Sequence, residues 1–175
     1  MSGKYIVRQP IKDPDGNIIG NEILYYGANQ AFSSDSSTSS AEFAAANTIY
    51  SFLTENSTKV LKGTLNFMTF TTMLLMKKTP RLFDKSDLVI QIDDAVIIHP
   101  LSMHLVQQFA KEGYRVAVNE FQFTPRYLAL LDDIHFIKIS ARTATEVTIR
   151  NTVEVAHSMN IKCIVTHIED AQTYE

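Results

Sequence analysis

Polar side chains interrupt or follow several apolar segments of this sequence, and these residues could serve a binding or catalytic site. The set comprises carboxylates, amides, a lysine and a hydroxyl group: Glu22, Asn66, Gln91, Asp94, Asn119, Glu120, Lys138 and Thr166. A polar residue within or just after a buried strand either lines a site at the strand's carboxyl end or is paired structurally. An isolated buried Lys or Glu costs several kcal/mol, so Lys138 and Glu22 are expected to pair if both point inward.

Other reactive residue types indicate no second site. The five histidines show none of the spacings of a zinc site. Cys163, the only cysteine, lies in an apolar segment and is interpreted as a small core residue rather than a nucleophile. No glycine-rich phosphate-binding loop is present.

Alternating strands and helices must position the polar residues. We expect strands at 5–11, 18–26, 65–70, 88–92, 115–118, 135–139 and 161–165, and helices at 42–55, 72–77, 101–112, 125–131 and 143–159. The turn Asp13-Pro-Asp-Gly16 predicts that the first two strands form an antiparallel hairpin. The later strands are almost wholly apolar, which favours a parallel sheet covered by helices, as an open α/β sheet or a (β/α) barrel.

Two of the expected helices lead to specific predictions. The helix at 101–112 is expected to bury one face, made of Leu101, Leu105 and Phe109. In the last helix, Thr143 and Glu146 have the spacing of a capping box, which places its start near Thr143.

Composition limits the classes of protein. The chain has 175 residues, which predicts one domain over 1–175 with a flexible serine-rich loop at about 33–40. A net charge of −3 without a run of basic residues disfavours nucleic acid and membrane surfaces as partners. The single cysteine and the absence of an apolar leader or membrane-spanning stretch favour a cytoplasmic protein.

Seven short segments resemble, in order, the strand-end motifs of the EAL domain family, the bacterial cyclic-di-GMP phosphodiesterases and their inactive relatives. The segments are Arg8–Ile11, Asn21–Tyr26, Leu65–Phe67, Val89–Asp94, Tyr114–Phe121, Phe136–Ile139 and Ile164–Asp170. The resemblance implies an α/β fold, a TIM-like (β/α) barrel with an antiparallel first strand pair. The sequence is most similar to the EAL half of EAL–HDOD regulators. The resemblance also implies that the chain is truncated before the family's last helix and strand.

The resemblance also implies a degenerate site. Active members use two Mg²⁺ or Mn²⁺ ions. Glu22, Asn66 and Lys138 match the family's catalytic Glu, its metal-binding Asn and the Lys beside the attacking water. By contrast, neutral or altered residues replace family carboxylates at Gln91, Asn119-Glu120 and Thr166, and Tyr26 replaces the Arg that contacts a ligand phosphate. Asp94 and Glu120 remain as possible holders of one weak cation.

The leading hypothesis is therefore a catalytically inactive EAL-like bacterial signalling domain, a pseudo-enzyme that acts through protein contacts. Lys138 is then interpreted as the cation of a structural ion pair, facing Glu22 and Glu120. The alternative is that Lys138 keeps a residual role in ligand binding. No cofactor is expected, and Mg or Mn would bind only with residual activity, for which Glu22, Asn66 and Glu120 are weak metal candidates. The alternatives are a non-hydrolysing cyclic-di-GMP or nucleotide receptor and a weak metal-dependent phosphodiesterase. A protein partner or a homodimer is expected at the sheet edge 161–165.

Overall fold

Seven strands form a single sheet in which each strand neighbours the next in sequence order. The computed structural model describes residues 5–26, 49–56 and 63–169. The predicted serine-rich loop at 33–40 lies outside the described residues, as does the first part of the helix predicted at 42–55, of which 49–56 is helical. The strands are β1 (Tyr5–Lys12), β2 (Ile18–Tyr26), β3 (Asn66–Thr69), β4 (Leu88–Ile92), β5 (Arg115–Asn119), β6 (Phe136–Ser140) and β7 (Lys162–Thr166).

The helices follow the strands as the alternating pattern predicts. They are α2 (Thr72–Met76), the 3-10 helix η1 (Thr79–Leu82), α3 (Asp94–Ile97), α4 (Pro100–Lys111), α5 (Pro125–Leu128) and α6 (Glu146–Ser158). None of the helices within the described ranges is long and apolar enough to cross a membrane.

The predicted hairpin is present: β1 pairs antiparallel with β2. Gly16 has a φ of +86° in the turn, a conformation that side chains with a Cβ rarely adopt. All later pairs, from β2–β3 to β6–β7, are parallel. The antiparallel first pair predicted from the sequence is therefore confirmed.

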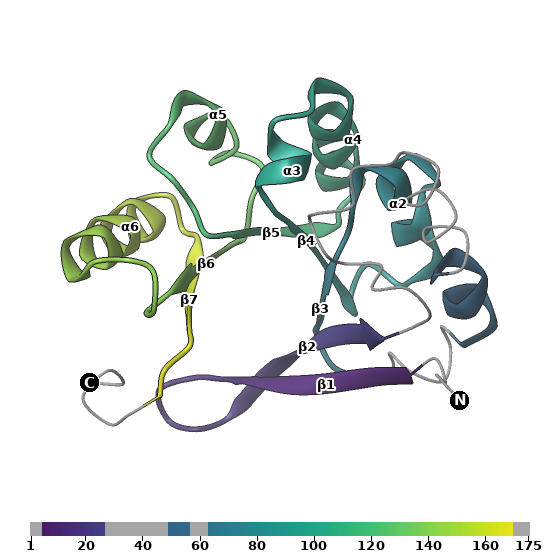
Figure 1. Cartoon of the computed structure of the whole chain (residues 1–175), viewed down its shortest axis with the longest axis horizontal. Coiled ribbons are helices and arrows are strands. Elements are labelled where there is room, and N and C mark those ends of the chain that lie inside the picture. The colour runs from purple at the N-terminus through teal and green to yellow at the C-terminus, as the bar shows by residue number, and fades with distance from the viewer. Residues whose placement is uncertain (1–4, 27–48, 57–62, 170–175) are drawn as a thin grey trace.

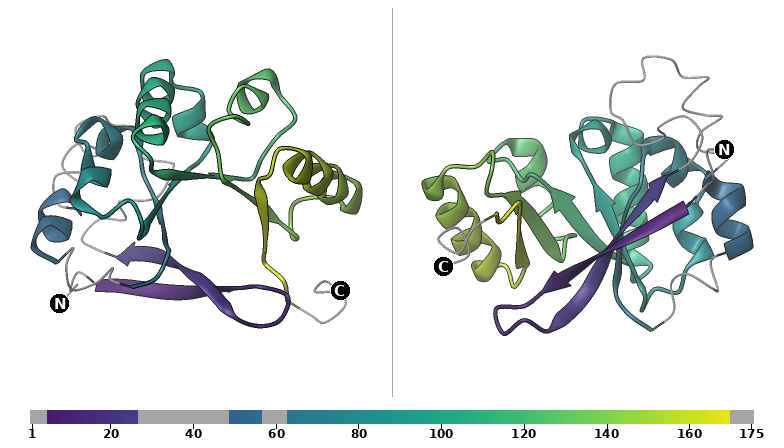
Figure 2. Two further views of the ribbon diagram at one scale, coloured as in Figure 1. Left: turned by 180° about the vertical axis from the view of Figure 1, so that it is seen from behind. Right: turned by 60° about the horizontal axis from the view of Figure 1, so that its bottom comes forward.

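The sheet curls into part of a ring, with its helices on the outer face (Figure 1). β1 and β7 are the two ends of the strand order, and among the described residues they do not pair with each other. Figure 2 shows the long β1–β2 hairpin crossing beside the ring at a steep angle to the helix-covered strands. The fold is thus a half-barrel, in agreement with the expected TIM-like α/β class.

Successive side chains of each strand point to opposite faces of the sheet, so the sheet has an apolar layer on each face. One lies between the sheet and its helices and includes Ile90, Val116, Val118 and Ile137. The other lies inside the ring and consists of Phe67, Val89, Ala117, Phe136 and Ile164, with Ile11 and Leu65 packed against it. Across this interior, the rings of Phe67 and Phe136 meet edge to face with their centroids 4.9 Å apart.

A close backbone approach requires glycine at one point of the sheet. A Cβ built on Gly20 would lie 2.7 Å from the backbone oxygen of Leu65, where β2 runs against the segment that enters β3. Any larger residue at position 20 would force these two strands apart.

Two predictions about helices need correction. Phe109 is buried and Leu105 packs against the core, as expected, but Leu101 is 45 % exposed, and its neighbour Ser102 is buried. Ser102 donates its hydroxyl to Thr72 on α2 at 2.8 Å. The last helix is capped not by Thr143 but by Thr145, whose hydroxyl accepts the Thr148 N–H at 3.2 Å.

Candidate functional site

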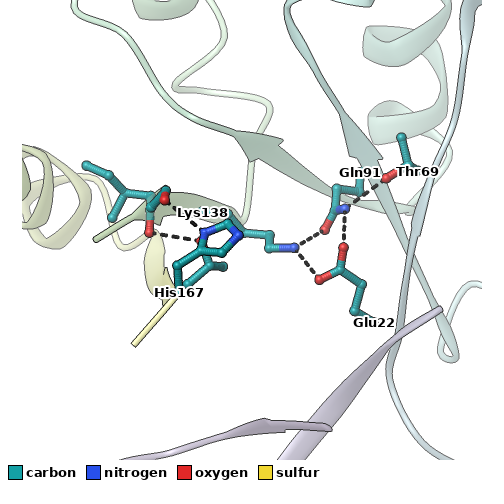
Figure 3. Close-up of polar contacts among 8 residues, drawn as sticks. Glu22, Thr69, Gln91, Lys138 and His167 are labelled. Carbon is teal, nitrogen blue, oxygen red and sulfur yellow. Dashed lines mark hydrogen bonds and ion pairs between the residues drawn. The ribbon is translucent and has the colours of Figure 1, made fainter. Parts of the chain in front are cut away.

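Four strands contribute to one polar network at the carboxyl side of the ring's interior (Figure 3). The Lys138 ammonium on β6 donates to Glu22 Oε2 on β2 at 2.8 Å and to Gln91 Oε1 on β4 at 2.9 Å. Gln91 Nε2 in turn donates to Thr69 Oγ1 on β3 at 2.9 Å and to Glu22 Oε1 at 3.3 Å. The predicted pairing of Lys138 with Glu22 is therefore present and spans the ring.

The chemistry of this network assigns the orientation of each group. An ammonium only donates, so Gln91 must turn its oxygen toward Lys138 and its NH₂ toward Thr69 and Glu22. The Lys138 side chain is 6 % exposed and that of Glu22 is 22 % exposed. Both carboxylate oxygens of Glu22 have donors, so the four side chains form a self-contained set of charges and hydrogen bonds.

A second polar cluster lies where β6 and β7 end. Ser140 Oγ and His167 Nδ1 are 2.8 Å apart, and Thr166 Oγ1 is 3.2 Å from the same ring nitrogen. Ser140 Oγ also accepts the Arg142 N–H at 3.2 Å, and Thr166 Oγ1 donates to the Ile139 backbone oxygen at 3.4 Å.

Two non-glycine residues with left-handed backbones follow the strands at this side of the ring. Glu120, after β5, has a φ of +51°, and His167, after β7, has a φ of +58°. The Glu120 N–H donates to the Lys138 backbone oxygen at 2.8 Å, which holds the bend in place. Such backbone conformations concentrate where side chains are aimed at functional sites.

A large cavity adjoins both clusters. Its volume is about 1470 Å³, and its lining includes Glu22, Asn119, Lys138, Ser140 and His167. The opposite wall comes from the β1–β2 hairpin, including Gln9, Ile11 and Lys12. The cavity is therefore placed between the polar network and the unpaired ends of the sheet.

Asn66 does not join the Lys138–Glu22–Gln91 network, with which it was expected to share a pocket. It is the first residue of β3, at the amino side of the sheet, and is fully buried. Its Nδ2 donates to the backbone oxygens of Thr64 at 2.7 Å and Asp87 at 3.2 Å. The side chain that β3 directs to Gln91 is Thr69, because these two residues are register partners at the carboxyl side.

Other predicted site residues also lie apart from the network. Asp94 begins α3, where its Oδ1 accepts the Tyr127 hydroxyl at 3.0 Å. Burial and this hydrogen bond both raise the pKa of Tyr127, so that hydroxyl remains a donor. Glu120 lines the cavity, but its side chain is exposed and does not pair with Lys138, contrary to expectation. Tyr26 ends β2, and its side chain lies outside the described part.

Three residues of the two clusters were not predicted from the sequence: Thr69, Ser140 and His167. Thr69 and Ser140 are polar residues at the last positions of their strands, so strand-end position was the signal that could have identified them. His167 follows β7 directly, and only its spatial position beside Ser140 distinguishes it from the other histidines.

The residues do not fit the two divalent cations that the EAL resemblance implies. Such ions require several oxygen ligands, chiefly carboxylates. Here Glu22 is the only carboxylate of the network, and the Lys138 ammonium lies 2.8 Å from it. Within the described residues, no group of three or more His, Cys, Asp or Glu side chains is arranged to hold a metal, and Asn66 and Glu120 do not join Glu22.

Comparison with known proteins supports the fold. No family model matches the sequence. The uncharacterized protein YuxH of Bacillus subtilis is 24 % identical over 176 residues, which cover 98 % of this chain and 42 % of YuxH. This chain therefore spans less than half of that relative.

Solved structures of EAL proteins match nearly the whole chain. The PaMucR phosphodiesterase in complex with c-di-GMP matches with a TM-score of 0.73 at 15 % identity, over 98 % of this chain and 88 % of that one. The Bacillus subtilis YkuI protein, which has an EAL domain and was solved with substrate c-di-GMP and calcium, matches with a TM-score of 0.72 at 15 % identity, over 97 % of this chain and 50 % of that one. The fold of this chain is thus that of EAL domains.

Proposed function

We propose that this chain is a degenerate EAL-like bacterial signalling domain that does not hydrolyse cyclic-di-GMP and acts through contacts with protein. The observation that carries the proposal is the position of the Lys138 ammonium between Glu22 and Gln91. A positive charge already neutralises the one carboxylate of the network, so little negative charge is left to attract divalent cations.

Neutral side chains in place of metal-binding carboxylates remove the means of hydrolysis but leave the packing of the barrel interior intact. In metal-assisted phosphodiester hydrolysis, a pair of cations stabilises both the attacking and the leaving oxygen. An amide at Gln91 in place of a carboxylate keeps the volume and hydrogen bonding of the side chain while deleting its charge. The network therefore supports the barrel interior without offering a place for a Lewis acid.

A non-hydrolysing receptor for cyclic-di-GMP is the second candidate. It is favoured by the 1470 Å³ cavity and by the hydrogen-bonding groups of Ser140, Thr166 and His167 that line it. PaMucR and YkuI were both solved with c-di-GMP. This candidate requires saturable binding that does not depend on a metal.

One titration separates these functions. Cyclic-di-GMP is titrated calorimetrically into the purified protein, once with Mn²⁺ and once with EDTA, and the mixtures are then analysed for the linear dinucleotide. We expect neither binding heat nor product, with an active EAL phosphodiesterase as the positive control. Product in the presence of Mn²⁺ would refute the proposal, and binding in both buffers without product would favour the receptor.

A further inference from the structure

The segments that lead into β4 and β5 carry an excess of positive charge. Residues 77–87 precede β4 and residues 109–115 join α4 to β5, and the two segments meet because β4 and β5 are parallel neighbours. They contain six Lys or Arg and three Asp or Glu, although the whole chain has a net charge of −3. This part of the molecule lies at the amino ends of the strands, away from the polar network at their carboxyl ends.

The cations gather around one carboxylate, that of Glu112 at the end of α4. Arg81 donates to Glu112 Oε1 at 2.7 Å, and Lys85 Nζ donates to the Glu112 backbone oxygen at 2.5 Å. The hydrogen bond from Arg81 lowers the pKa of Glu112, and the positive charge of Lys78 acts in the same direction. The carboxyl end of a helix attracts a cation, and Lys85 fills that place. The helix end therefore accounts for one of these cations and not for the others.

Nearby acidic side chains leave most of this charge uncompensated. Asp84 Oδ1 accepts the backbone N–H of Ser86 at 3.4 Å and its hydroxyl at 3.2 Å, so this carboxylate is held within its own turn. Arg115 Nη1 donates to the Ser86 backbone oxygen at 3.5 Å, which places its guanidinium beside the same turn. Among the residues that the structure describes, neither Arg115 nor Lys78 nor Lys85 forms an ion pair. We call Lys78, Arg81, Lys85 and Arg115 the basic surface.

Aromatic packing holds two of these cations in place. The Arg81 guanidinium lies 5.8 Å from the centre of the Phe109 ring, and Lys85 Nζ lies 5.5 Å from the centre of the Tyr114 ring. Cation–π attraction and the hydrogen bonds to Glu112 together restrict both side chains. A surface whose side chains are already ordered loses less conformational entropy when a partner binds.

An acidic segment of a protein fits the basic surface better than a nucleic acid does. Proteins that bind single strands stack the bases on accessible aromatic rings. Here Phe109 and Tyr114 are only 2 % and 3 % exposed and lie beneath the cations, so bases cannot stack on them. Duplex binding typically uses about six to ten phosphate contacts, more than the basic surface can supply.

We propose that the basic surface docks an acidic segment of a protein partner, whose carboxylates pair with Lys78, Lys85 and Arg115 while Arg81 stays with Glu112. The complementary charge steers the partner to this end of the sheet and fixes its orientation there. This inference rests on the proposed protein-interaction role and specifies the chemistry of the partner.

The test uses a labelled, blocked peptide of about eight alternating aspartate and serine residues, which in extended form presents all its carboxylates on one face. The same peptide with asparagine in place of aspartate is the control. Binding to the full chain is measured by fluorescence anisotropy at about 0.02 M and about 0.5 M salt, because screening increases severalfold over this range. We expect saturable binding of the aspartate peptide that weakens at high salt, and at least about tenfold weaker binding of the asparagine peptide.

Two pairs of variants locate the binding. Lys78→Gln removes an unpaired cation and should weaken binding about twofold to fivefold, whereas Lys162→Gln, the same change on β7, should not. Glu112→Gln removes the carboxylate that competes with the peptide and frees Arg81, so it should strengthen binding by a similar factor. Glu146→Gln, the same change on α6, should leave binding unchanged. Circular dichroism checks that each variant is folded.

Several outcomes would overturn this inference. They are equal binding of the two peptides, absence of binding at low salt, equal effects of Lys78→Gln and Lys162→Gln, and no gain from Glu112→Gln. Tighter binding of a single-stranded oligouridine with the same number of charges would assign the basic surface to nucleic acid instead. None of these results depends on cyclic-di-GMP, so hydrolysis of that dinucleotide would refute the proposed function without changing the outcome of the peptide test.

Discussion

The burial of the Lys138 ammonium beside Glu22 leads to a quantitative prediction about stability. Glu22→Gln keeps the size and hydrogen-bonding atoms of the side chain but removes the countercharge of an ammonium that is 6 % exposed. Removing one partner of a buried ion pair typically costs about 3–5 kcal/mol, because the other charge stays buried without compensation. Since Glu22 is itself 22 % exposed, some water reaches the pair, and we expect a loss of about 2–4 kcal/mol.

Substitution of the other partner, Lys138, should cost less stability. In Lys138→Met, the charge left behind is the carboxylate of Glu22, which reaches solvent and still accepts from Gln91 Nε2. The expected loss is about 1–2 kcal/mol, chiefly from the unpaired Gln91 oxygen. The double variant should be no less stable than Glu22→Gln alone. The sum of the two single losses should therefore exceed the loss of the double variant by about 1–2 kcal/mol, the loss expected for Lys138→Met.

Equilibrium urea unfolding at pH 7 measures these differences, provided that the m-value is unchanged. In thermal unfolding, a loss of 3 kcal/mol should lower Tm by roughly 6–12 °C for a domain of this size. Glu146→Gln is the matched control, because the Glu146–Arg150 pair has the same 2.8 Å separation but side chains that are 85 % and 70 % exposed. Its effect should stay within about 0.5 kcal/mol. Equal losses for Glu22→Gln and Glu146→Gln would refute the reasoning.

Three further predictions concern the surrounding structure. Tyr127→Phe should cost about 1 kcal/mol in urea unfolding, because the lost hydroxyl donates to Asp94 at 3.0 Å; Tyr114→Phe, whose hydroxyl is 3.4 Å from the Phe83 oxygen, should cost less. Thr145→Ala should cost about 1 kcal/mol, because it removes the N-terminal cap of α6. An equal or larger loss for Thr143→Ala would contradict this assignment and favour the helix start near Thr143 that the sequence predicts. Burial, aided by the positive charge of Arg115, lowers the pKa of His135, whose Nδ1 accepts the Val116 N–H. The folded state therefore binds this proton less readily than the unfolded chain, so stability is fully present above about pH 6.5 and falls as the pH drops below it. His135→Gln should flatten the dependence of unfolding free energy on pH between about 7 and 5.

Much of the fold could be read from local patterns. Strands, helices and the β1–β2 hairpin follow from apolar periodicity and turn residues, which act over a few neighbouring positions. The pairing of Lys138 with Glu22 was also predictable, because two opposite charges in apolar strands must compensate one another if both are buried. A neutral amide at Gln91 was visible in the sequence, and the resemblance to EAL domains implies a carboxylate at this position.

What only the tertiary structure decided is which polar residues meet. Asn66 and Thr69 both lie on β3, but they are three positions apart and therefore point to opposite faces of the sheet. The β3–β4 register brings Thr69 to Gln91. Ser140 and His167 meet through the pairing of β6 with β7 and the left-handed backbone at His167. Residue type thus determined which groups were available, and strand register and curvature determined which of them act together.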